Sequence, residues 1–385
     1  MKTVFDPRYD LIINKLIEFR ENGQATQTSL SSKLGKPQSY IAKIEGRDRR
    51  LDIIELFDIL KALNVSPKQF FRAIGWIPDT NIPVPIKANA EETDNGILLS
   101  MVAEDKLYKV ALDSVKATDY LQVETKLSDL FAGLNQSGTS VKNRDVIADA
   151  LEIAFRLMPD LNPSDAYHHV VYRLYLREHY RSKAEQSWVR AGGEGLALFI
   201  KNHYAPILGP SGILIVPLFD DRNRQVEVLK QMGIHGTVSN SKLDVALYGT
   251  SGGESVLFGG MHVKASLAER VSDDVHCSEA MMRQGFMSLL FTFDAKSFPP
   301  PNGDLVNRGE FGTPDEPSDK RQCIEKHGSF DACFSYNLRT IPTPHTTKTK
   351  SVIYTSRFGA EDPLPAFIID FWQRFSQQKV TLGAH

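Results

Sequence analysis

The stretch KLDVALYGTSGGESVLFGGMHVKASLAER, residues 242–270, decides the fold of the larger part of this chain. Two apolar runs are separated by the turn sequence TSGGES, a pattern typical of a β-hairpin. Asp244 is the polar residue of the first run, and His262 and Lys264 hold alternate positions in the second. A lysine inside a strand is costly unless a partner or a reaction uses its charge. The stretch therefore predicts either a polar strand face or an active site.

Asp244 and Lys264 are expected to meet across this hairpin. Lys264 follows Asp244 by 20 residues, and His262 follows it by 18. Because adjacent strands joined by a short turn lie side by side, the carboxylate and the ammonium should come within a few ångströms of each other. The alternative is a partly exposed strand of alternating polarity, in which both charges are solvated.

An acid on one strand followed by acid-x-Lys on the next resembles the PD-(D/E)xK nuclease superfamily. The helix expected around 275–285 and the strand expected around 286–295 follow in the order of that core, and the resemblance spans roughly residues 145–300. KASLAER (264–270) is also similar to the K-x-S-L-x-E-R run that follows the catalytic lysine in some type II restriction endonucleases. The resemblance implies an α/β core with a mixed sheet.

The implied chemistry accounts for the residue types. In phosphodiester hydrolysis Mg²⁺ polarises the phosphate and lowers the pKa of the attacking water, while carboxylates hold the ion. A lysine positions the water or stabilises developing charge. The resemblance assigns Asp244 to the metal and Lys264 to catalysis, with Mn²⁺ as a substitute ion. It also implies that Ser266, Glu269 and Arg270 support the site or face DNA.

His262 stands where the motif usually has Glu or Asp, and imidazole is a poor ligand for Mg²⁺. Some superfamily members take this carboxylate from the following helix instead. Glu279, 15 residues after Lys264, is the first candidate for the relocated acid, and Glu269 is the second. Otherwise the histidine marks a weakened or inactive site.

Other acids are weaker candidates. Glu194 lies on a helix expected at 188–208 that resembles the helix preceding the core in these enzymes, where it could face the metal; Glu152 is a rival for that role. Each is otherwise a surface acid. A competing placement of the site, with the same spacing, uses Asp274, Asp294 and Lys296. It is less favoured because Asp274 falls in a polar, helix-like segment and Lys296 ends its strand.

The first 78 residues are expected to be helical throughout. Thr26 is a good N-cap and Gly35 a good stop for the second helix, and Ile41 and Ile44 point inward from the third. Two more helices are expected at 51–64 and 66–76.

Residues 10–64 resemble the Cro/C1-type (XRE) helix-turn-helix family. Gln27 opens the second helix, SLSSKLG forms the turn, and QS (38–39) opens the third helix. Arg20 and Glu45 occupy the positions of an ion pair common in that family.

Basic side chains gather around this turn and the third helix, at Lys33, Lys36, Lys43, Arg47, Arg49 and Arg50. Such a patch can contact phosphates while the third helix reaches base edges in the major groove. The candidates for DNA contact are Gln27, Gln38, Ser39, Tyr40, Lys43 and Arg47. The alternative is a solvated basic face on a helical protein-interaction module.

The expected organisation is a helix-turn-helix domain at 1–78, a linker at 79–95 and a catalytic domain at 96–385 whose part up to about 205 is helical. Three prolines and little periodicity in residues 77–95 predict the linker. Beyond it, strands are expected at 212–218, 242–250, 255–265, 286–298 and 351–357, with a loop at 299–320 and a closing helix at 363–375.

Composition narrows the class of protein. The 385 residues are 42% hydrophobic and 24% charged, as in soluble globular proteins. A formal charge of −2 means that nucleic-acid binding must come from local patches. No apolar run approaches the roughly 20 residues that span a bilayer. Three dispersed cysteines are too few for a disulfide framework or a zinc site. A cytoplasmic protein without a membrane partner is expected.

The leading hypothesis is a Mg²⁺-dependent, sequence-specific endonuclease of a restriction-modification system that acts on double-stranded DNA. Cutting both strands of a palindrome calls for two symmetry-related sites, so a homodimer is expected. A cognate DNA methyltransferase would act on the same sequence without needing to bind this protein. The helix-turn-helix domain would add DNA recognition or autoregulation. Specificity is expected in loops including 299–345, where the available cations are Lys320, Arg321, Lys326, Arg339 and Lys348.

The alternative is a helix-turn-helix transcriptional regulator with a non-catalytic C-terminal sensor domain, which would bind DNA without cutting it. A helix-turn-helix protein with a zinc protease domain is excluded because it requires His-Glu-x-x-His, which the sequence lacks.

Overall fold

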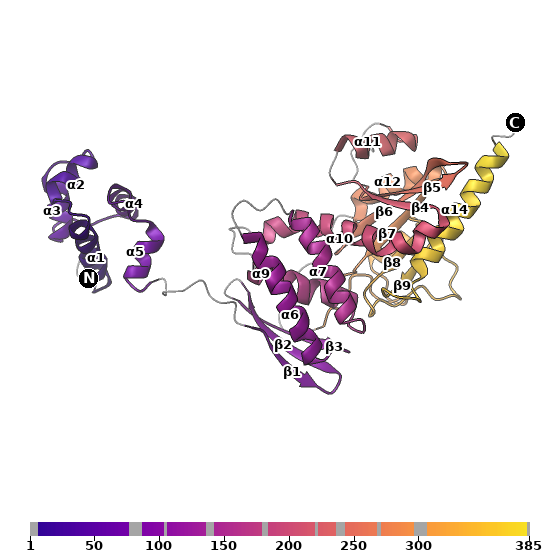
Figure 1. Cartoon of the computed structure of the whole chain (residues 1–385), viewed down its shortest axis with the longest axis horizontal. Helices are drawn as coiled ribbons and strands as arrows, with labels where there is room; N and C mark the ends of the chain where they lie inside the picture. Colours follow the sequence, from indigo (N-terminus) through magenta and orange to yellow (C-terminus); the bar gives the residue numbers. More distant parts are fainter. Residues whose placement is uncertain are drawn as a thin grey trace. The chain divides into compact units, whose positions relative to one another are not determined.

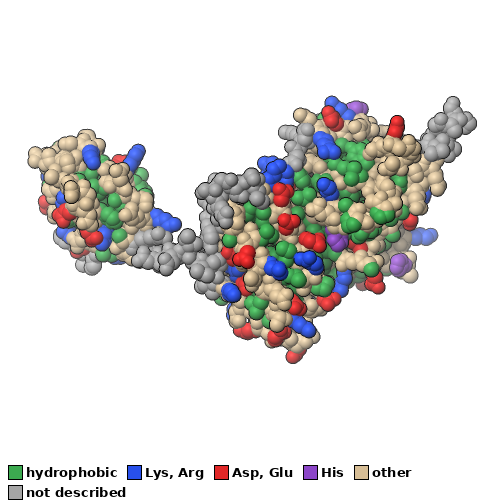
Figure 2. Space-filling view, viewed as in Figure 1, with side chains coloured by type: hydrophobic (Ala, Val, Ile, Leu, Met, Phe, Trp, Pro, Cys, Tyr) green, Lys and Arg blue, Asp and Glu red, His purple; other side chains and the backbone are tan. Residues whose placement is uncertain are grey.

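The computed structural model describes residues 7–76, 87–103, 106–135, 142–178, 184–219, 222–235, 243–267, 271–295 and 306–382. The chain forms two compact units, Met1–Val84 and Pro85–His385 (Figure 1). On the face drawn in Figure 2, basic and acidic side chains are interspersed on both units. None of the described helices is long and apolar enough to cross a membrane.

The N-terminal unit consists of the helices expected from the sequence. They are α1 (Pro7–Asn22), α2 (Gln27–Lys33), α3 (Ser39–Glu45), α4 (Ile53–Ala62) and α5 (Pro67–Ala73). Thr26 caps α2 by accepting a hydrogen bond from the Ser29 backbone N–H at 3.0 Å, and Gly35 follows α2 with a φ of 62°. Asp52 and Glu55 form a capping box at the start of α4.

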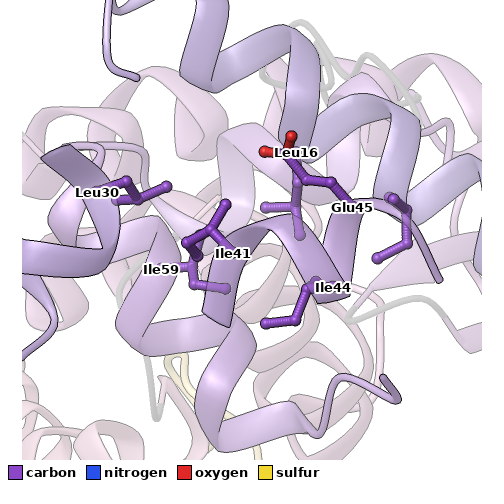
Figure 3. Close-up of a pocket in the computed structure, with 7 residues that line it drawn as sticks. Leu16, Leu30, Ile41, Ile44, Glu45 and Ile59 are labelled. Carbon is purple, nitrogen blue, oxygen red and sulfur yellow. The ribbon is translucent and has the colours of Figure 1, made fainter. Parts of the chain in front are cut away.

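The core of this unit fixes the angle between α2 and α3. Figure 3 shows Leu16, Leu30, Ile41, Ile44 and Ile59 lining one small space between the helices, and all five are buried. Glu45 borders this space, and its Oε1 lies 2.6 Å from Arg20 Nε. The ion pair predicted from the sequence is therefore confirmed.

A three-stranded antiparallel sheet begins the C-terminal unit, where a linker and helices were expected. Its strands are β1 (Asn89–Thr93), β2 (Gly96–Ala103) and β3 (Lys106–Asp113), in the order β1-β2-β3. Ile97, Leu99 and Met101 are buried at alternate positions of β2. This period of two is the signal that the helical interpretation missed, so the prediction was wrong for residues 89–113.

A helical layer follows, as predicted for the region up to about 205. It contains α6 (Ala117–Ala132), α7 (Asn143–Leu157), α8 (Pro163–Asp165), the π-helical turn η3 (Ala166–Val171), α9 (Tyr172–Glu178) and α10 (Ala184–Leu208), with short 3₁₀ turns at Gly133–Asn135 and Gly209–Ser211. Gly195 lets α10 approach α7, since a Cβ at this position would lie 2.7 Å from Ile147 Cγ2. Because α7 and α10 pack this closely, they form one helical layer against the second sheet.

The second sheet is mixed, as predicted for the core, and has six strands. The order is β4 (Ile213–Pro217), β5 (Val245–Ser251), β6 (Glu254–Lys264), β7 (Met287–Thr292), β8 (Ala332–Ser335) and β9 (Val352–Thr355). β4, β5 and β6 pair antiparallel, and β6 to β9 pair parallel. The expected hairpin is therefore β5–β6.

Helices cover both faces of this sheet. α7, α10 and α14 (Pro363–Leu382) contribute to the core on one face, together with strand residues such as Val263. α11 (Arg222–Gln231), α12 (Val271–Arg283) and α13 (Asp319–Glu325) pack on the other face. Successive strand residues point to opposite faces, so His262 and Lys264 share the face that α12 covers. α12 and α14 were predicted, whereas α11, α13 and β8 were not.

Candidate active site

The β5–β6 hairpin brings Asp244 and Lys264 together. Asp244 directly precedes β5, Lys264 ends β6, and Val245 pairs with Met261 across the two strands. Lys264 Nζ donates a hydrogen bond to Asp244 Oδ2 at 3.0 Å. The contact predicted from the 20-residue spacing is confirmed.

The carboxylate of Asp244 is held in place by the backbone of the neighbouring strand. Asp244 Oδ2 also accepts a hydrogen bond from the Val263 N–H at 2.8 Å. The backbone carbonyl of Asp244 accepts one from the Leu218 N–H at 2.9 Å. Its side chain remains 27% exposed. The carboxylate is thus fixed against β6 and still accessible to a ligand.

Asp274 completes the group, and the sequence interpretation did not place it there. It is the fourth residue of α12, and its Oδ2 lies 3.2 Å from Lys264 Nζ. Its side chain is only 5% exposed. Lys264 therefore lies between two carboxylates from different elements. The only signal in the sequence was an acid one turn into the helix that follows the lysine strand.

His262 is a buried neighbour of this group. Its side chain is fully buried, with the ring edge-on to Phe330 at a centroid distance of 5.6 Å. Its Nδ1 lies 3.5 Å from Asp274 Oδ1. The imidazole thus occupies the position of the expected acid and contacts the acid that α12 supplies.

The charges in the group stabilise one another. Burial lowers the pKa of Lys264, but the negative charges of Asp244 and Asp274 outweigh burial and raise it above its ordinary value. Burial raises the pKa of Asp274, but the contacts with His262 and Lys264 outweigh burial and lower it. At neutral pH the ammonium and the Asp274 carboxylate are therefore both charged.

Glu279 and Glu194 do not contact Lys264. Glu279 lies five residues beyond Asp274 in α12, which turns it to another side of the helix, where its carboxylate contacts Ser329 Oγ at 3.5 Å. Glu194 binds Arg144 at 3.4 Å and Arg190 at 2.8 Å. Two other predicted site residues, Glu269 and Arg270, lie outside the described residues.

Ser266 contacts a loop. Its Oγ donates to Glu310 Oε1 at 2.9 Å, and the Glu310 carboxylate also pairs with Lys320. Asp294, which the competing placement used, is buried, and its carboxylate accepts hydrogen bonds from Thr340 Oγ1 and the Glu310 N–H, both at 2.6 Å.

The described members of the competing placement have other partners. Asp274 contacts Lys264, and Asp294 is bonded to Thr340 and Glu310 and has its pKa raised to about 7 by burial. Lys296 lies outside the described residues.

The pair Asp244 and Asp274 suits a divalent cation. Both carboxylates contact the same ammonium, so their Oδ2 atoms lie at most about 6 Å apart. Across the described parts of the chain, no group of three or more His, Cys, Asp or Glu side chains could hold a metal ion. Mg²⁺ commonly binds one or two carboxylates together with waters and substrate phosphates, and this donor set fits that pattern.

The helix-turn-helix candidates differ in exposure and in internal hydrogen bonding. Gln38, Ser39 and Lys43 are exposed on and beside α3, and Gln38 Nε2 also donates to Thr28 Oγ1 at 3.4 Å. Gln27 Nε2 donates to Glu45 Oε2 at 2.6 Å, and Arg47 Nε donates to Asp10 Oδ1 at 2.5 Å. The last candidate, Tyr40, is half-buried beneath the Arg49 guanidinium, 4.6 Å from the ring centroid.

Three of the five loop cations expected to be available for DNA make internal contacts. Lys320 pairs with Glu310, Arg321 pairs with Glu325, and Arg339 pairs with Asp165 and Asp113. Lys326 and Lys348 are exposed.

Comparison with known proteins agrees with this architecture. Residues 222–362 match the family described as BsaWI restriction endonuclease type 2, and residues 16–70 match the family described as Helix-turn-helix. The type II restriction enzyme AgeI of Thalassovita gelatinovora is 46% identical to this chain over 259 residues, which are 66% of this chain and 91% of AgeI.

The fold agrees with a solved relative as well. The crystal structure of a specific AgeI–DNA complex has a TM-score of 0.65 and 41% sequence identity, covering 71% of this chain and 99% of that chain. Nearly the whole length of AgeI is therefore matched by this chain, and the helix-turn-helix match at 16–70 precedes the restriction endonuclease match at 222–362. The chain belongs to the type II restriction endonucleases and carries an additional N-terminal helix-turn-helix domain.

Proposed function

We propose that this sequence-specific endonuclease hydrolyses double-stranded DNA with Asp244, Asp274 and Lys264 as its catalytic group. The observation that carries the proposal is the contact of one ammonium with two carboxylates, at 3.0 and 3.2 Å, at the end of β6. Carboxylates and a lysine in one cluster are the groups that metal-assisted phosphodiester hydrolysis needs. The regulator alternative offers no reason for this cluster.

Asp244 and Asp274 are the residues that would hold Mg²⁺, or Mn²⁺ in its place. The ion, when bound, supplies a Lewis acid for the scissile phosphate and a bound water of lowered pKa. The Val263 N–H orients the Asp244 carboxylate before any ligand arrives. Asp274 gains the same fixed position from α12 and from its contact with His262.

Lys264 acts as a positive charge and not as a base. Its raised pKa keeps the ammonium protonated at neutral pH while the carboxylates lie beside it. From this position it would orient the attacking water and stabilise the negative charge that develops on the phosphate oxygens. His262, whose imidazole is a poor ligand for Mg²⁺, would keep Asp274 in place.

The enzyme would act as a homodimer in the cytoplasm, with one site for each strand of a symmetric sequence. The helix-turn-helix domain would contact DNA through Gln38, Ser39 and Lys43, which are exposed. This contact would add DNA recognition to the enzyme or regulate its own gene, and a cognate methyltransferase would protect the same sequence.

The test is cleavage of mixed-sequence DNA by the full chain with MgCl₂ or MnCl₂. We expect discrete fragments from the wild type and a loss of at least about 100-fold in rate for Asp244→Asn and Lys264→Ala. Asp370→Asn, an exposed carboxylate on α14, is the matched control and should cut normally. Intact DNA under both metals would leave the regulator alternative standing.

A further inference from the structure

A four-residue turn, Asn307–Glu310, packs at the end of the sheet where β6 and β7 finish, next to the proposed catalytic group. The Glu310 N–H donates to Asp294 Oδ1 at 2.6 Å, just after β7 ends. The Asp294 carboxylate is itself held by Thr340 Oγ1. The turn therefore rests on a buried side chain between two parallel strands.

The backbone of the turn is fixed by two further features. Asn307 is buried, with Nδ2 donating to Ser164 Oγ at 2.8 Å and Oδ1 accepting from the Gly309 N–H at 3.1 Å. Gly309 has a φ of 77°, and a Cβ there would lie 2.3 Å from Asp294 Oδ2. Only glycine fits this close approach to Asp294.

The turn also contacts the segment that directly follows β6. Glu310 Oε1 accepts a hydrogen bond from Ser266 Oγ, and Ser266 lies two residues after Lys264. Lys320 neutralises the Glu310 carboxylate from α13. The contact between Ser266 and Glu310 therefore fixes the turn close to the end of β6, where Lys264 lies.

Arg308 is the residue that this turn presents. Its side chain is exposed, whereas Asn307 is buried and Glu310 is engaged. Within the described ranges no hydrogen bond, ion pair or ring contact holds the Arg308 guanidinium. Lys320, Arg321 and Arg339 nearby in sequence all have internal partners.

We infer that Arg308 reads a guanine of the target sequence through the major groove, donating to its O6 and N7. The inference rests on the proposed function. Arginine is the side chain that most often makes this bidentate contact, and its planar fork demands a fixed orientation. A phosphate contact needs only a charge, which a flexible loop supplies equally well. The rigid turn under Arg308 favours the directional contact.

The experiment uses a plasmid library with a randomised segment, cut by the full chain with Mg²⁺, followed by sequencing of the cleaved ends. Wild type defines the site. For Arg308→Ala and Arg308→Lys alike, we expect the guanine preference to be lost at one position and its symmetry mate. Cleavage efficiency on the wild-type site should fall about 10- to 100-fold.

Arg308→Lys is the decisive variant because it keeps the charge and removes the fork. If lysine restores wild-type preference, or if both variants lower cleavage uniformly across sequences, Arg308 contacts a phosphate and the inference is wrong. Unchanged cleavage and preference in Arg308→Ala also overturn it. Arg374→Ala, an exposed arginine on α14, should match the wild type.

The two levels of the proposal fail in different ways. If the wild type cuts the library and only the Arg308 result is negative, the catalytic assignment stands and the base-reading role falls. If the wild type leaves the library intact, the proposed function falls, and the base-reading role with it.

Discussion

At the scale of single residues, His262 explains how the site departs from its motif. The imidazole is fully buried at the position of the expected acid, 3.5 Å from Asp274. Two strand residues on the same face, His262 and Lys264, both meet Asp274 because α12 covers that face. The second carboxylate beside Lys264 comes from the following helix, and it is Asp274, whereas Glu279 contacts Ser329.

Exchanging the two helix acids tests this assignment. Asp274→Asn should lower the single-turnover cleavage rate with Mg²⁺ by at least about 100-fold, because one of the two carboxylates beside Lys264 loses its charge. Glu279→Gln should retain cleavage, since its carboxylate faces Ser329. The opposite pattern, with both variants folded by circular dichroism, would return the metal role to Glu279.

Asp294 should make stability depend on pH. Burial raises its pKa from 3.8 to about 7, so between these values the folded chain keeps a proton that the unfolded chain releases. The free energy of unfolding of the wild type should therefore fall as pH rises from about 4 to about 7. Asp294→Asn removes this pH dependence. The free energy of unfolding of the variant, relative to that of the wild type, should therefore rise between pH 5 and pH 7.5.

Urea denaturation at the two pH values measures this effect. If the difference in free energy of unfolding between wild type and Asp294→Asn stays constant from pH 5 to 7.5, the Asp294 carboxyl titrates alike in the folded and unfolded chains, and the prediction is wrong.

At the scale of elements, β5 and β6 hold the site, and α14 supports them from the opposite face. Gly249 in β5 faces Trp372 so closely that a Cβ would lie 2.3 Å from the Trp372 ring. Phe258 in β6 packs on the same indole at a centroid distance of 5.1 Å. A glycine here is a packing requirement, because the indole occupies the space of a side chain.

Gly249→Ala should therefore destabilise the C-terminal unit. The added methyl group forces the rigid indole or the strand to move, which typically costs about 1–3 kcal/mol. Gly133→Ala is the control, since nothing lies within 4 Å of its Cβ position. The measurement is the thermal unfolding midpoint of each variant. If Gly249→Ala unfolds at the same temperature as Gly133→Ala and the wild type, the packing argument is wrong.

At the scale of the whole molecule, the chain joins two units that match different protein families. The relative AgeI and its DNA complex match 66% and 71% of this chain, and the helix-turn-helix match lies at residues 16–70. The proposed catalytic group, Asp244, Asp274 and Lys264, belongs entirely to the C-terminal unit. Loss of DNA contact by the N-terminal unit should therefore change binding without changing the chemical step.

The double variant Gln38→Ala/Lys43→Ala tests this separation in the full chain. We expect weaker binding to mixed-sequence DNA, measured by fluorescence anisotropy in EDTA, with a smaller dependence of affinity on salt. The single-turnover cleavage rate at saturating enzyme should stay within about twofold of the wild type. Lys61→Ala on α4 is the control, and a large loss of cleavage rate in the double variant would contradict the separation.

Much of the fold follows from short-range sequence signals. Thr26, Gly35 and the TSGGES turn determine local structure through neighbours a few residues away, so the N-terminal helices and the β5–β6 hairpin were predictable. The contact between Asp244 and Lys264 follows from the same hairpin. β8, only four residues long and buried on both faces, gave no such pattern.

The sequence by itself determined the family, the mixed α/β core, and one carboxylate paired with one lysine. Only the tertiary structure decided that Asp274 is the second carboxylate and that Asp294 anchors a turn. The first outcome depends on which face of β6 is covered by α12 and on the rotation of α12 about its axis. The second depends on where residues 307–310 pack against the end of β7. Both are fixed by side-chain packing between distant segments. Strand pairing through a short turn is local, whereas helix rotation is set by the whole core.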